Sequence, residues 1–367
     1  MRLAGAPPLA APRPRRLHAG RSWRVRASAA AVSDTEGTWS VRRTPKHLML
    51  QGSGVFNNFR NTPALRVCAD SRVAAQIRGV EVYHRVLRPH APAGLPVLVL
   101  HGGPQVPHDY LLPLSRLASA AAPRAVAFYD QPGCGRSGAP ATPSDALYSV
   151  AGSVALLADV LPRMADVAGA GGVHLLGQSW GGVLALEYAL AVGRDASLPR
   201  PASVAMATTP AEVPLLHAEV ARLQAALPAD VRETMQRHEA AGTTSSPEYA
   251  AALGAFYARH QCLIQPRPAC VEAAFAKAGR EWRGTGVIAD WAAPRGEALA
   301  RAWPPGLPAL LLSGEADFVT PACVKPLADA LPGARWALLR GASHMPHLEV
   351  PGAFDAELQA FWKKAEA

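Results

Sequence analysis

The 367-residue sequence lacks several features that mark other classes of protein. It has no uninterrupted apolar run of about 18 residues, which argues against a membrane span. Its five cysteines are scattered, odd in number and without a C-x-x-C pair, which favours reduced thiols over a disulfide framework or a zinc site. His344 and His347 have a spacing that could suit a metal, but they lack a helical setting and a third ligand. We therefore expect no metal and no cofactor.

Acidic residues are missing from the first 33 positions, which contain seven arginines and are rich in alanine and proline. This composition is typical of an organelle transit peptide, and residues 25–31 resemble a chloroplast processing site. A secretory signal would need a longer apolar core. We expect residues 1–33 to direct the protein to the chloroplast stroma, with the cytoplasm as second choice and a disordered basic tail as the alternative. Without these seven charges the formal net charge falls from +9 to +2, which removes the main support for a nucleic-acid partner.

Apolar residues make up 49% of the chain, enough for a large core. Short all-apolar runs bounded by glycine or polar loops are typical of parallel strands buried on both faces. We predict strands at residues 73–77, 80–87, 96–100, 125–130, 173–176, 203–207, 307–312 and 336–339, and a helix over 145–167. The first two strands would form an antiparallel edge, so the fold class is α/β with a mostly parallel sheet between helices.

Strand-like runs stop between residues 211 and 300, where the chain is rich in Ala, Glu, Arg and Leu. An inserted helical cap explains this change, with residues 71–210 and 301–367 forming the α/β core that the cap covers. Residues 34–70 are predicted to be an N-terminal extension of that core.

Ser179 lies in the motif Gly-Gln-Ser-Trp-Gly-Gly, between a predicted strand and a predicted helix. A G-x-S-x-G at such a junction is the nucleophile elbow, although a glycine-rich turn can imitate it. Asp317 and His344 follow later, each just past a strand end, in the chain order of the α/β-hydrolase triad. We predict Ser179 as nucleophile, His344 as base and Asp317 as the group that orients the base. His347 and Asp290 are the weaker alternatives for base and acid.

The strand at 96–100 runs into a His-Gly-Gly-Pro loop. The Gly-Gly step removes Cβ atoms, so that backbone N–H groups can face a ligand. In α/β hydrolases this loop supplies half of the oxyanion hole, and the residue after the nucleophile supplies the other half. We predict the N–H groups of Gly103 and Trp180 for this role, with a simple tight turn as the alternative.

Together, four loop motifs resemble those of the proline iminopeptidases, also called prolyl aminopeptidases. They are HGGP at 101–104, DQPGCGRS at 130–137, GQSWGG at 177–182 and GASHMP at 341–346. Segments 256–262 and 284–291 are similar to the branch that includes the tricorn-interacting aminopeptidases. The resemblance covers roughly residues 71–365. It implies release of an N-terminal residue, often proline, through an acyl-enzyme and without a metal.

The resemblance also implies acidic groups that hold the free ammonium of the substrate. Glu281 matches the first of these acids and is the predicted substrate-binding residue, with a solvated cap glutamate as the alternative. The second acid, directly after the catalytic Asp, is replaced here by Phe318, and Gln105 replaces a common glycine. The expected partner is a small peptide or acyl substrate. An esterase or amidase, and a non-catalytic ligand-binding protein of the same fold, remain as alternatives.

Overall fold

The computed structural model describes residues 67–140, 146–168, 170–279 and 288–367, which belong to one compact unit. The predicted transit peptide, Glu281 and the extension up to residue 66 lie outside the described residues. None of the helices within the described ranges combines the length and apolar character that a bilayer crossing requires.

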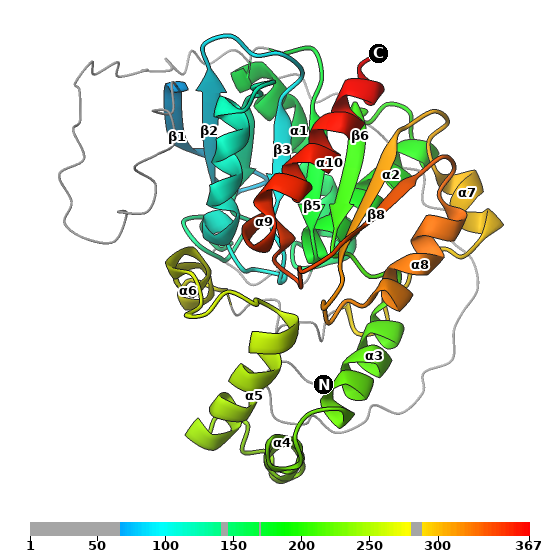
Figure 1. Cartoon of the computed structure of the whole chain (residues 1–367). Helices are drawn as coiled ribbons and strands as arrows, with labels where there is room; N and C mark the ends of the chain where they lie inside the picture. Colours follow the sequence, from blue (N-terminus) through cyan, green and yellow to red (C-terminus); the bar gives the residue numbers. More distant parts are fainter. Residues whose placement is uncertain (1–66, 141–145, 169, 280–287) are drawn as a thin grey trace, which may run out of the picture. The chain divides into compact units, whose positions relative to one another are not determined.

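Eight strands of the described chain form one mixed sheet in the order β1-β2-β4-β3-β5-β6-β7-β8 (Figure 1). Strand β1 pairs antiparallel with β2, β2 pairs antiparallel with β4, and all remaining pairs are parallel. The strands are β1 (Val67–Ile77), β2 (Val80–Pro89), β3 (Val97–Leu100), β4 (Val126–Tyr129), β5 (His174–Gln178), β6 (Ser203–Ala207), β7 (Ala309–Gly314) and β8 (Arg335–Leu339). Each predicted strand is present, and β1 begins at Val67, within the segment predicted as an extension.

Helices cover both faces of this sheet (Figure 1). One apolar cluster joins the sheet to α1 (Val150–Ala168), α2 (Trp180–Arg194) and α8 (Pro321–Ala330). A second cluster joins the other face to η2 (His108–Ser119), α10 (Pro351–Ala365) and the short α9 (Pro346–Glu349) that precedes α10. The α/β-hydrolase architecture predicted from the strand pattern is confirmed.

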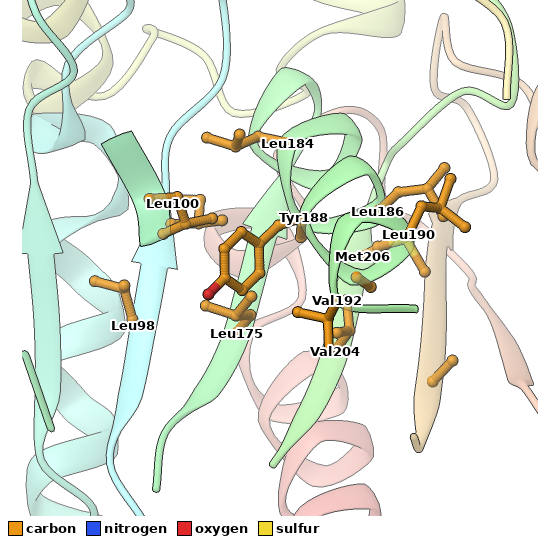
Figure 2. Close-up of a cluster of buried hydrophobic side chains, with 14 of the residues drawn as sticks. Leu98, Leu100, Leu175, Leu184, Leu186, Tyr188, Leu190, Val192, Val204 and Met206 are labelled. Atoms are coloured by element: carbon orange, nitrogen blue, oxygen red, sulfur yellow. The ribbon is translucent and has the colours of Figure 1, made fainter. Parts of the chain in front are cut away.

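The first cluster fixes α2, and so the turn before it, against the middle of the sheet. Figure 2 shows side chains of α2, such as Leu184 and Tyr188, beside Leu98 and Leu100 of β3 and Leu175 of β5. All five are fully buried. Burying a side chain of this size contributes about 2 kcal/mol to stability, so separating the helix from the strand ends would cost a large share of that free energy.

Between β6 and β7 the chain is helical, with α3 (Val213–Ala225), α4 (Ala229–Ala241), α5 (Pro247–His260), α6 (Ala269–Ala276) and α7 (Glu297–Ala302). Helices α3, α4 and α5 enclose a small apolar cluster of their own, against which Phe318 of the core packs. Helix α6 instead contributes to the cluster that contains η2. The helical segment is thus anchored to the core at more than one place.

Glu366, just after α10, connects that helix to the N-terminal ends of β3 and β5. It accepts hydrogen bonds from Arg124, from His174 Nε2 at 2.9 Å and from the backbone N–H of Leu95 at 2.8 Å. The Arg124 guanidinium also stacks over the ring of Trp362. Burial by itself would raise the pKa of Glu366, but these donors outweigh it and lower the pKa to about 2.

Replacement of Glu366 by glutamine is expected to destabilise the fold at neutral pH. A carboxyl pKa lowered from its ordinary 4.5 to about 2 corresponds, once it is discounted for the solvent screening of a partly exposed carboxylate, to about 1 to 2 kcal/mol of stability, or about 3 °C in Tm. Because the folded-state pKa is depressed, this stability is present above pH 4.5 and is lost as pH falls toward 2. Thermal unfolding of E366Q and wild type should therefore differ at pH 7 and converge only as the pH approaches 2. The control E357Q breaks the more exposed pair with Arg335 and should lower stability by less than about 1 kcal/mol.

Candidate active site

Ser179 occupies the sharp turn between β5, which ends at Gln178, and α2, which begins at Trp180. Its backbone has φ 56° and ψ −121°, a region that a residue with a side chain enters only under strain of about 1 to 3 kcal/mol. Its N–H donates to Ala207 O at 2.9 Å, which holds the turn against β6. Ser179 is half-buried between buried neighbours, so its side chain stands at the boundary between the core and solvent.

Three glycines make this turn possible, because each is in contact with another part of the chain. A Cβ on Gly177 would lie 2.1 Å from Gly181 O, and a Cβ on Gly181 would lie 2.1 Å from Leu100 O. On Gly182 it would lie 1.8 Å from the Thr209 hydroxyl. The motif therefore reflects close backbone approach at the elbow rather than a loose turn.

His344 and Asp317 meet after β8 and β7, at the strand ends where the sequence predicted them. His344 Nδ1 donates to Asp317 Oδ1 at 2.8 Å, and the N–H of Val319 donates to the same oxygen at 2.8 Å. Both side chains are buried. Burial raises the pKa of Asp317, although contact with His344 works in the opposite direction. With its Nδ1 proton committed to Asp317, the imidazole presents Nε2 as the nitrogen that can accept a proton.

The two weaker alternatives are placed elsewhere. His347 is 1% exposed and donates from Nε2 to Tyr110 O at 3.0 Å, while burial lowers the pKa of its ring to about 3. Asp290 is exposed, whereas Asp317 makes the contact with His344. The arrangement therefore favours His344 and Asp317 as the acid–base pair.

The Gly-Gly loop is held in place by its first two residues, which leaves the third for a ligand. Gly102 N–H donates to the hydroxyl of Tyr110 at 2.8 Å, so it is not available to an oxyanion. Gly103 has φ 117° and is half-buried. His101 is fully buried, accepts from Gln131 N–H at 2.9 Å, and has its pKa lowered by burial to about 4, so it is neutral.

Gln131 connects this loop to the helix that follows the elbow. Its side-chain amide donates to His101 O at 3.0 Å, and its Oε1 accepts from the indole N–H of Trp180 at 2.9 Å. Trp180 is the first residue of α2, where the helix dipole favours a negative charge near the backbone N–H groups. The two residues predicted for the oxyanion hole thus lie on segments joined by one glutamine.

The cap is attached to the loops that carry Asp317 and His344. Phe318 N–H donates to His260 O at 3.1 Å, and the His260 ring lies 2.9 Å from Ala316 O. The ring of Phe318 lies against that of His344, with centroids 4.1 Å apart and the two planes tilted by 31°. One face of the imidazole is thus covered by an apolar ring that also packs against the helices of the cap.

Acidic groups near these loops are engaged by other residues. Glu349 accepts from Ser343 N–H at 2.7 Å and from Leu263 N–H at 2.7 Å. Glu219 accepts from Arg222 and from the Thr320 hydroxyl. Neither carboxylate is a ready partner for a substrate ammonium.

Known proteins are similar to this chain over most of its length. The sequence model of the alpha/beta hydrolase family matches residues 97–357. The proline iminopeptidase of Lactobacillus delbrueckii subsp. lactis is 34% identical over 272 residues, covering 73% of this chain and 89% of that protein. The chain belongs to the proline iminopeptidase group of the α/β-hydrolase family. It is therefore a hydrolase, as the loop motifs predicted.

Solved structures of α/β hydrolases agree with this assignment. The proline iminopeptidase of Mycobacterium smegmatis is 32% identical with a TM-score of 0.69, and the match covers 81% of this chain and 99% of that one. VinJ is 33% identical with the same TM-score, covering 80% and 99%. The folds therefore correspond over about four-fifths of this chain and nearly the whole length of the two solved chains.

Some residues of the site were not anticipated from the sequence. Tyr110, Gln178 and Gln131 link the elbow to the loops around it. Gln178 lies within the recognised motif, but the motif itself does not specify what occupies the position before the serine. Tyr110 lies in η2, whose apolar spacing is interrupted by Pro113.

Proposed function

We propose that this hydrolase is a serine aminopeptidase that releases N-terminal proline or a small residue from peptides. The observation that carries the proposal is a half-buried serine in a strained elbow, on a fold that sets a buried His344–Asp317 pair at neighbouring strand ends. The substrate class is supported by the relatives, two of which are named proline iminopeptidases. Localisation to the plastid stays a prediction from the basic leader. N-terminal sequencing of the protein recovered from plastids can test it.

In the proposed reaction, His344 Nε2 takes the proton of the Ser179 hydroxyl as its oxygen attacks the carbonyl carbon of the first peptide bond. The imidazolium that forms is stabilised by Asp317, and it then gives its proton to the leaving amine as the C–N bond breaks. Water then hydrolyses the acyl-enzyme ester by the same steps. His344 takes a proton from the water as its oxygen attacks the acyl carbon. His344 returns that proton to the Ser179 oxygen as the acyl–oxygen bond breaks, which releases the acid. The backbone N–H groups of Gly103 and Trp180 would hold the oxyanion in both halves.

The decisive measurement compares proline, alanine and leucine arylamides with their N-acetylated forms and with simple aryl esters. We expect kcat/KM to be highest for the free amines, and acetylation to lower it by about 10²-fold or more because a charge-assisted contact to the ammonium is lost. Equal cleavage of acetylated amides or esters would refute the aminopeptidase assignment while leaving a serine hydrolase.

Glu281 supplies a matched test of how the ammonium is held. If it is the anchor, E281Q should raise KM for the free-amine arylamides and leave the rate on aryl esters unchanged. The control D290N removes an exposed carboxylate nine residues later in the sequence and should change neither.

Phe318 favours a second candidate, an esterase or amidase for small neutral acyl compounds. Its ring covers one face of His344 and continues into the apolar cluster of the cap. Glu349 and Glu219 already use their oxygens in hydrogen bonds to other residues, so neither is free to hold an amine without giving up those bonds. Preference for the aryl esters in the same assay would select this candidate.

A further inference from the structure

Gln178, the residue before Ser179, uses its whole side-chain amide in buried hydrogen bonds. Its Nε2 donates to His344 O at 3.0 Å and to the Thr208 hydroxyl at 2.9 Å, while its Oε1 accepts from the Tyr110 hydroxyl at 2.6 Å. The side chain is 4% exposed. Flipping the amide would set two oxygens, Oε1 and His344 O, against each other, so the orientation is fixed.

Tyr110 extends this set of contacts to the oxyanion loop. Its hydroxyl accepts from Gly102 N–H at 2.8 Å, and its own proton is donated to Gln178. The hydrogen bonds therefore run in one direction, from Gly102 through Tyr110 to Gln178, and from Gln178 to the carbonyl of His344. Tyr110 is 1% exposed, and in such a dry setting the bonds are strong and a missing partner is costly.

We propose that Gln178 is a positioning residue that holds the oxyanion loop, the nucleophile and the base in one geometry, with Tyr110 as its link to the loop. This inference rests on the proposed roles of Gly103, Ser179 and His344. The backbone of Gln178 continues directly into Ser179, and its side-chain amide donates a hydrogen bond to the main-chain carbonyl of His344. Loss of the amide would let these segments drift apart, and a displacement of about 1 Å at a reacting centre can lower the rate about 10²-fold.

Thr208 offers a matched control because it lies off this path. Its hydroxyl accepts one hydrogen bond from Gln178 and is fully buried. T208V removes that acceptor but keeps the bonds that connect Gly102, Tyr110, Gln178 and His344. It therefore reports the effect of losing a buried hydrogen bond here without breaking the connection.

The experiment uses the full chain and a fluorophosphonate probe, which reads the serine whatever the natural substrate is. We expect Q178M to slow labelling of Ser179 by about 10²-fold and to lower kcat on an aryl ester similarly, with KM little changed. Y110F, which frees the Gly102 N–H, should also slow labelling. T208V should label at a rate close to wild type even where its Tm falls as far as that of Q178M.

Each outcome separates the positioning role from a structural one. Labelling of Q178M and Y110F at the wild-type rate would overturn the proposal, as would slowing of all three variants in proportion to their loss of Tm. If Q178M does not fold, Y110F against T208V carries the same test. Absence of labelling in folded wild type would instead refute the proposed serine hydrolase mechanism.

Discussion

Replacement of Ser179 by alanine is expected to lower kcat by about 10³-fold or more while leaving the fold intact. The hydroxyl is the only group removed, because alanine keeps the Cβ and the N–H that donates to Ala207 O. The strained backbone is imposed by the glycine contacts and by α2 rather than by the hydroxyl. Turnover should fall to the level that the oxyanion hole and substrate binding support without a nucleophile.

Active-site titration and Tm together check this result. S179A should lose fluorophosphonate labelling and keep a Tm close to that of wild type. The control S313A removes a buried hydroxyl of β7 that accepts from the Trp336 indole at 2.9 Å, and it should retain activity. A loss of less than about tenfold in S179A would mean that another residue is the nucleophile.

The elbow could be predicted from sequence because its requirements are local. A Cβ would clash with another part of the chain at Gly177, Gly181 and Gly182, so glycine is required there. The apolar runs before and after these glycines specify a strand and a helix. The positions of Asp317 and His344 followed from one further rule, that parallel strands end at the same edge of a sheet. The structure places the two in contact.

The supporting contacts could not be predicted in this way. Gln178 binds Tyr110 and His344, which lie 68 and 166 residues away in the sequence. No periodicity marks such partners, because a buried amide and a buried tyrosine look like ordinary core residues until the chain has folded. The ring contact between Phe318 and His344 is equally non-local, and the sequence indicated only that Phe318 cannot neutralise an amine.

Asp317 differs from these supporting residues because it carries a charge into a fully buried site. Its pKa is raised by burial, and the bonds from His344 and Val319 only partly offset this effect. A carboxyl whose folded-state pKa is raised stabilises the fold fully at low pH, and that stability is lost as pH rises through the folded-state pKa. At neutral pH the ionised carboxylate is therefore held at a cost in folding free energy. In the proposed mechanism, this carboxylate is the group that orients the base.

Asp317 replaced by asparagine should accordingly separate activity from stability. We expect kcat to fall by about 10⁴-fold at pH 7, because the asparagine amide can donate to Nδ1 and favour the wrong tautomer of His344, and because the imidazolium loses its counter-charge. The Tm at pH 7 should be equal to or above that of wild type, and any advantage should disappear below pH 4, where the wild-type carboxyl is protonated. Steady-state rates and unfolding curves from pH 3 to 8 measure both effects. A lower Tm at pH 7 with only a modest loss of kcat would instead make Asp317 a structural residue of the β7–α8 turn, where it binds Val319.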